Sequence, residues 1–93
     1  MDLPVNYETL HYTQRRAVRE EYIKLQNGKC CHCGAPLTGS AAEHVLKKIV
    51  MKSLFPSTFF DHPVHLHHSH DTGMTIGAIH SYCNAVLWQY HGE

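Results

Sequence analysis

Residues 64–84 read VHLHHSHDTGMTIGAIHSYCN, and this stretch decides the fold that we expect. Apolar and histidine side chains alternate over residues 64–68, which is typical of a half-exposed strand. Residues 71–73 have the composition of a turn, residues 74–79 form a second short apolar strand, and residues 81–91 predict a helix. A strand pair that runs directly into a helix predicts an α+β fold, with the strand ends close to the first turn of that helix.

Two more helices are expected before this unit, which spans residues 64–91. Residues 9–27 carry an apolar stripe at helical spacing and end at an Asn-Gly pair. Residues 40–56 repeat apolar side chains at a similar spacing, between a serine cap and a proline stop. A knuckle rich in cysteine, with glycine and proline, separates the two helices at residues 29–39. We therefore expect a single domain over residues 1–93.

The cysteine and histidine content points to bound metal. A chain of 93 residues buries little surface and is marginally stable without help, and this one holds ten histidines and four cysteines. The first residues lack the basic and apolar regions of a secretory signal, and no apolar run reaches the roughly 20 residues of a membrane span. We expect a cytoplasmic protein with reduced thiols, in which cysteines bind metal rather than form disulfides.

Two ligand pairs at short spacing predict a structural zinc site. The pairs are Cys30 with Cys33, and His80 with Cys83. A tight turn lets each pair reach one ion, and zinc prefers four sulfur or imidazole ligands in a tetrahedron. The run Cys31-His32-Cys33 leaves another choice of ligands open, although we expect Cys31 to be a small buried side chain outside the site. Four free thiols without metal are the remaining alternative.

A second, catalytic metal site is predicted where the strand pair meets the last helix. Packing of that helix against the strands brings Asn84 towards His67, so that both can bind one divalent ion. His68 has the pKa range of a general base, and the ion would stabilise charge on a phosphate and on the leaving oxygen. Three roles remain open for His91: a third ligand of the ion, a contact with the phosphate, or the end of the helix without a functional role. The alternative is a group of exposed histidines with no shared role.

Neighbouring residues are given simpler roles. Asp61-His62 is a rival Asp-His pair, but it lies in a loop without the turn that follows His67-His68. Its simpler role is packing or loop capping. We expect Trp88 and Tyr90 to belong to the core rather than to form a platform for stacking bases.

Residues 64–87 resemble the motif of the HNH (ββα-metal) endonucleases. The nearest branch is the phage recombination endonuclease VII type, in which a D-H-D-H-x-T-G segment precedes R-G-x-x-C-x-x-C-N. The resemblance covers residues 10–39 and 62–91, with 40–61 as an insertion. It implies a small zinc-supported ββα-metal fold in a bacterial or phage protein that cuts DNA. By position it implies general base His68, catalytic-ion ligands His67 and Asn84, and zinc ligands Cys30, Cys33, His80 and Cys83.

Several positions depart from the pattern of this branch. His67 replaces the usual Asp, Ser69 replaces a second acidic residue, and His80 replaces a cysteine. The middle Asn of the motif, expected near Thr75, is absent. A ligand set of His and Asn carries no negative charge and holds hard Mg²⁺ poorly, whereas imidazole favours ions such as Mn²⁺. We therefore expect Mn²⁺ to support cleavage better than Mg²⁺.

The distribution of charge predicts contact with DNA. The formal net charge is zero, yet residues 11–52 hold all eight Lys and Arg against three Glu, a balance of +5. Non-specific contacts with the DNA backbone are expected from Arg15, Arg16, Arg19, Lys47 and Lys48. An ordinary solvated helix face is the alternative.

One active site per chain predicts that a monomer nicks one strand, and paired cuts would need a homodimer or two visits. Two other functions remain open. One is a non-catalytic zinc-knuckle module that binds nucleic acid, and the other is a histidine-rich metal buffer.

Overall fold

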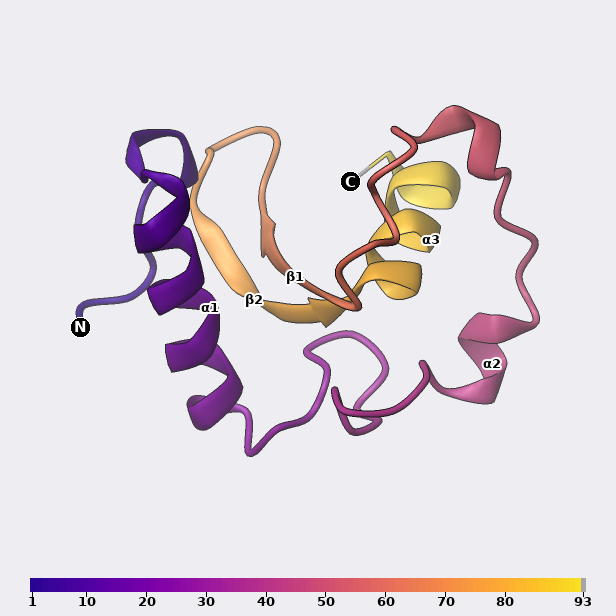
Figure 1. The fold of residues 1–93 in the computed structure, drawn as a ribbon, viewed down its shortest axis with the longest axis horizontal. Coiled ribbons are helices and arrows are strands. Elements are labelled where there is room, and N and C mark those ends of the chain that lie inside the picture. Colours follow the sequence, from indigo (N-terminus) through magenta and orange to yellow (C-terminus); the bar gives the residue numbers. More distant parts are fainter. Residues whose placement is uncertain (93) are drawn as a thin grey trace.

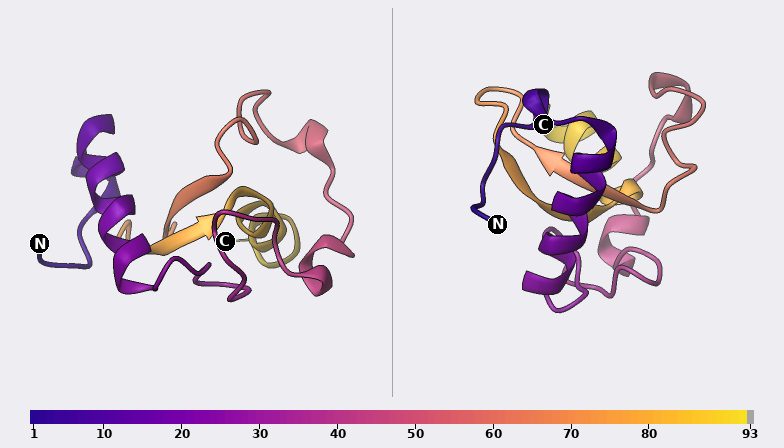
Figure 2. Two further views of the ribbon diagram at one scale, coloured as in Figure 1. Left: turned by 60° about the horizontal axis from the view of Figure 1, so that its bottom comes forward. Right: turned by 60° about the vertical axis from the view of Figure 1, so that its left-hand side comes forward.

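The centre of the fold is an antiparallel hairpin formed by β1 (Val64–His68) and β2 (Thr75–His80). α3 (Ser81–His91) follows β2 directly, and α1 (Tyr12–Leu25) lies on the other side of the hairpin (Figure 1, Figure 2). The computed structural model describes residues 1–92, so Glu93, the last residue of the predicted domain, lies outside the described residues. The predicted α+β class is confirmed.

The core joins the hairpin to the helices around it. Its largest fully buried side chains are Ile79, Val45, Val86 and Cys83. Tyr22 of α1 reaches the hairpin, where its hydroxyl lies 2.9 Å from Oγ1 of the buried Thr75. The same Oγ1 accepts a hydrogen bond from the backbone N–H of Val5 at 3.0 Å. Thr75 therefore fixes both α1 and the amino-terminal segment to β2.

Gln26, directly after α1, connects this helix to β2. Its side-chain amide donates to the carbonyls of Lys29 at 2.7 Å and Ala78 at 2.9 Å, and its Oε1 accepts from the Ala78 N–H at 2.8 Å. Gly77 makes this approach possible, because a Cβ there would lie 2.7 Å from Oε1 of Gln26 and 3.0 Å from Cβ of Cys31. Only glycine leaves room for both neighbours.

The prediction of one helix over residues 40–56 is wrong. The structure has a single helical turn, α2 (Glu43–Leu46), and a short 3-10 turn, η2 (Lys52–Leu54). Ala42 rather than Ser40 precedes α2 and gives no side-chain cap. Side chains of α3 form hydrogen bonds with the backbone between α2 and η2. Tyr82 donates to the carbonyl of Lys48, and both Gln89 and Tyr90 donate to the carbonyl of Ile49. Gln89 also accepts a hydrogen bond from the N–H of Met51. These tertiary hydrogen bonds override the apolar periodicity, and Ile49 is left 77% exposed.

The other predicted elements agree with the structure to within a few residues at their ends. Asn27 and Gly28 have φ values of 56° and 73°, the left-handed conformation that ends a helix. The expectation that Trp88 and Tyr90 are core residues is wrong, since they are 43% and 46% exposed. Among the described helices, none combines the length and the apolar character needed to cross a membrane.

Candidate metal centre and adjoining histidine pocket

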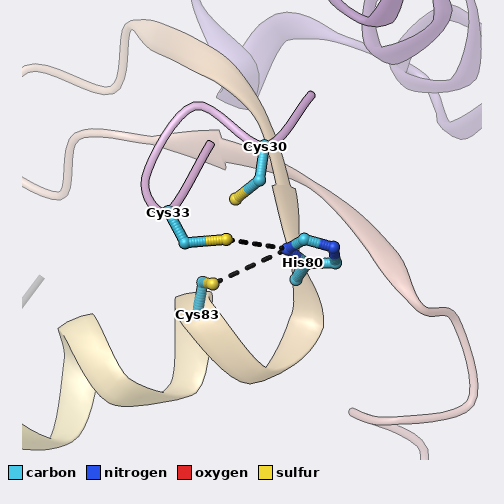
Figure 3. Close-up of side chains that lie close together, drawn as sticks. All are labelled: Cys30, Cys33, His80 and Cys83. Atoms are coloured by element: carbon cyan, nitrogen blue, oxygen red, sulfur yellow. Dashed lines mark hydrogen bonds between the residues drawn. The ribbon is translucent and has the colours of Figure 1, made fainter. Parts of the chain in front are cut away.

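Cys30, Cys33, His80 and Cys83 come together as the spacing of the two pairs predicts. The first pair lies on the turn after α1, His80 ends β2, and Cys83 lies in the first turn of α3 (Figure 3). All four ligand atoms lie within 4.8 Å of one another, and three of the four residues are buried. Within residues 1–92, no other group of three or more Cys, His, Asp or Glu side chains converges in this way.

The distances within this cluster suit a tetrahedral ion. Nδ1 of His80 lies 3.4 Å from Sγ of Cys33 and 3.7 Å from Sγ of Cys83. Bonds of about 2.3 Å to sulfur and about 2.0 Å to nitrogen at tetrahedral angles place the nitrogen and sulfur atoms about 3.5 Å apart. The cluster can therefore hold a metal ion, and its Cys₃His composition is consistent with structural zinc.

The surrounding hydrogen bonds prepare these side chains to be ligands. Nε2 of His80 lies 2.9 Å from the carbonyl oxygen of Pro36, so it carries the proton and leaves the Nδ1 lone pair facing the sulfurs. A hydrogen bond from the Cys83 thiol, supported by backbone N–H donors, lowers the pKa of Cys30 to about 3. The same hydrogen bond, together with burial, raises the pKa of Cys83. The cluster thus favours a thiolate, the form that binds metal.

Cys31 lies outside the cluster, in agreement with the prediction that Cys30 and Cys33 are the ligands of this turn. Its side chain lies against Gly77 of β2, and it is exposed rather than buried as expected. Partial desolvation and the nearby Cys30 raise the pKa of the Cys31 thiol to about 11. This thiol therefore stays protonated at neutral pH.

A second feature, which we call the histidine pocket, opens beside the hairpin. This open pocket of about 670 Å³ is lined by His65, His68 and Asn84, among other residues. Nδ2 of Asn84 lies 3.2 Å from Nδ1 of His65, and Nε2 of His65 lies 2.8 Å from the carbonyl oxygen of Phe59. The second contact leaves Nδ1 of His65 without its proton and available as an acceptor or ligand.

The structure brings His65, rather than the predicted His67, to Asn84. The pairing register shifts between His67 and His68, where His68 opposes Thr75 and His67 opposes Gly77. Such a bulge re-aims the side chains that follow it. As a result His68 shares the pocket with His65. His67 is 7% exposed and does not line this pocket, but it lines a smaller adjoining hollow with His68 and Ile76.

The ring of His68 is held by a stack with the amino-terminal segment. Tyr7 lies parallel to it, with ring centroids 3.9 Å apart and an angle of 6° between the planes. The guanidinium of Arg15 covers Tyr7 at 3.9 Å from its centroid, and its Nη2 donates to the Tyr7 carbonyl at 3.2 Å. Burial, assisted by the nearby His70, lowers the pKa of His68 below its ordinary value of 6.5. His68 is therefore a neutral imidazole at neutral pH.

The predicted DNA-binding cations divide into two groups. Arg15 and Arg19 line the histidine pocket, and Arg16 is exposed on the same helix. Lys47 forms an exposed ion pair with Glu43 at 3.7 Å, and Lys48 lies 5.0 Å from the ring centroid of Tyr90. Both lysines follow α2, and neither is among the residues that line the pocket. His91 is exposed in the last turn of α3.

Sequence reasoning missed Tyr7, the pairing of His65 with Asn84, and the aromatic side chains that line the pocket. Strand alternation places His65 on the same face of the strand as His67, so it could have indicated His65. No pattern links Tyr7 to His68, because their contact depends on how the amino-terminal segment crosses β2. No protein family, curated protein or solved structure gives a significant match to this chain.

Proposed function

We propose that this protein is a metal-dependent endonuclease that hydrolyses DNA phosphodiesters with the ββα-metal arrangement that its sequence resembles. One observation carries the proposal: a single pocket is lined by His68 from β1, Asn84 from α3 and Arg15 from α1. A general base, an ion ligand and a cation for the phosphate are the groups that this reaction needs around one phosphodiester.

The contact between His65 and Asn84 suits a divalent ion. Nδ2 of Asn84 is 3.2 Å from Nδ1 of His65, and rotation of the amide by half a turn exchanges Nδ2 for the ligand atom Oδ1. Adjacent ligands of an octahedral ion with bonds of about 2.1 Å lie about 3 Å apart. We therefore assign His65 and Asn84 as the ligands, in place of His67. Such an ion would act as the Lewis acid, and the neutral ligands favour Mn²⁺ over Mg²⁺.

The protein's own residues supply the remaining chemistry. His68 is neutral because burial lowers its pKa, so a ring nitrogen can accept the proton of an attacking water. Tyr7 holds the plane of this ring, and Arg15 and Arg19 offer positive charge to the phosphate. The base, the ion ligands and the cations thus come from β1, α3 and α1.

Nicking of supercoiled plasmid with Mn²⁺, Mg²⁺ or chelator tests the proposal. We expect nicking with Mn²⁺, slower nicking with Mg²⁺, and none with chelator in samples that retain their zinc. His68→Ala should slow nicking by about 10²–10⁴-fold with unchanged folding, whereas exposed His44→Ala should leave it unchanged.

Binding of DNA without metal-dependent nicking would leave a non-catalytic zinc module and reject the enzyme. Several metal ions bound with similar affinity, and no affinity for DNA, would instead indicate a metal buffer. Unchanged nicking by a folded His68→Ala protein would remove the role of the base.

A further inference from the structure

The histidine pocket is much larger than a phosphate and one ion require. Its volume of about 670 Å³ falls within the roughly 300–1,000 Å³ of pockets that enclose small organic ligands. The part beyond the histidines is lined by Phe55, Phe59 and Trp88. Hydrolysis of a phosphodiester does not require these three aromatic side chains, which we call the aromatic wall. The wall is therefore available to bind another part of a ligand.

The aromatic wall is connected to the reactive side chains. The ring of Phe55 lies 4.7 Å from Phe59 and 5.3 Å from Trp88, and Phe59 meets the ring of His65 edge-on at 4.7 Å. Trp88 is one helical turn after Asn84, so both project from the same face of α3. An aromatic ligand in this wall would therefore lie beside the residues assigned to the phosphate.

The charges of the pocket select an anion. Arg15 and Arg19 line it, and its described lining residues include no carboxylate. Nε of Arg15 is buried and has no hydrogen-bond partner among residues 1–92. A ligand with a flat aromatic part and an adjacent negative charge satisfies both halves of the pocket, and a nucleotide is such a ligand.

We propose that the aromatic wall binds an unpaired nucleobase, so that the substrate is single-stranded DNA. The inference rests on the proposed nuclease function and specifies its substrate class. In a duplex both faces of each base are stacked, and a base must leave the stack to meet an aromatic side chain in a pocket. Single strands offer those faces freely, and proteins bind them by combining stacking aromatic residues with a cationic groove.

Trp88 provides the direct test, because it is the one tryptophan of the chain. Its fluorescence is followed while the zinc-loaded protein, without added divalent ion, is titrated with a short oligothymidylate. The comparison ligands are an abasic strand of equal length and a duplex of the same length. We expect quenching by oligothymidylate and affinity about tenfold above that for the abasic strand. Equal affinity for both strands, stronger binding of the duplex, or unchanged fluorescence would overturn the proposal.

Substitutions of Trp88 test the same point by the anisotropy of a labelled strand. Trp88→Leu should reduce the affinity for oligothymidylate to that for the abasic strand, whereas Trp88→Phe should retain most of it. Leu25→Ala, at a position 65% exposed at the end of α1, is the control and should change nothing. Equal affinities of the Leu and Phe variants would count against stacking.

Cleavage of a circular single-stranded DNA with Mn²⁺, measured beside the plasmid assay, separates this proposal from the one on which it rests. Base-dependent binding without cleavage of either DNA would reject the enzyme but keep the nucleobase site. Nicking together with equal binding of abasic and normal strands would keep the enzyme and reject the nucleobase site.

Discussion

The cysteine cluster and the histidine pocket lie side by side on α3, and they differ in how complete they are. Cys83 is fully buried and faces the cluster, whereas its neighbour Asn84 is partly exposed and lines the pocket. The cluster has four ligand atoms facing one another, as a structural metal site does. The pocket is open, and it leaves polar groups directed at space that a substrate can enter. A closed metal site can stabilise the fold, whereas an open pocket can admit a substrate.

Removal of one cluster ligand is the strongest test of this difference. Cys83→Ser should abolish zinc binding and unfold the chain, because a structural zinc contributes on the order of 10 kcal/mol and a small domain has about 5–15 kcal/mol in total. Zinc content and far-ultraviolet circular dichroism measure the two effects. The matched control is Cys31→Ser, which should keep both zinc and fold. Zinc retained by Cys83→Ser, or lost from Cys31→Ser, would refute the ligand assignment.

Gln26 connects the turn that carries the cluster to β2, which pairs with the pocket-lining strand β1, so its loss should affect both regions. Gln26→Ala removes three hydrogen bonds and leaves backbone groups of Ala78 without these partners. We expect a loss of about 2–3 kcal/mol in the free energy of unfolding, measured by urea denaturation with zinc still bound. The neighbouring Leu25→Ala should change this value by less than about 0.5 kcal/mol. A similar small change for Gln26→Ala would show that the contact is not needed.

The two regions also differ in how far the sequence predicted them. The cluster follows from two short spacings, since each pair is brought together by a local turn, and all four ligands were predicted. His68 joins His65 in the pocket after a bulge that follows His67, a one-residue irregularity that strand alternation does not reveal. The helix predicted over residues 40–56 failed because side chains of α3, distant in sequence, bind the backbone there. Local spacing therefore predicted the closed site, and non-local contacts formed the open one.

Substitution of His65 and of His67 in parallel should distinguish a ligand from a buried side chain. His65→Ala should raise the Mn²⁺ concentration for half-maximal nicking by about tenfold or more, since even indirect ligand contacts change metal affinity by about 10–100-fold. His67→Ala should reduce the thermal midpoint, because the side chain is buried, and leave the Mn²⁺ requirement unchanged. The opposite pattern would restore His67 as the ligand.

Tyr7 should have the smallest effect, and it acts through His68. In the native protein the pKa of His68 is below 6.5, so the ring remains neutral until the pH falls through that lower value. If His68 is the base, as we propose, we expect nicking to be lost at that lower pH. Tyr7→Leu removes the stacked ring and admits water to the imidazole, which raises the pKa towards 6.5 and moves the acidic limb of the pH profile to higher pH.

A pKa that rises to about 6.5 leaves most of the imidazole neutral at pH 7, so nicking there should fall by less than about 1.5-fold, and the larger loss should lie at lower pH. Tyr7→Phe keeps the ring and should keep the native profile. A uniform loss of rate in Tyr7→Leu, with the acidic limb unmoved, would show that Tyr7 supports the fold rather than the protonation state of the base.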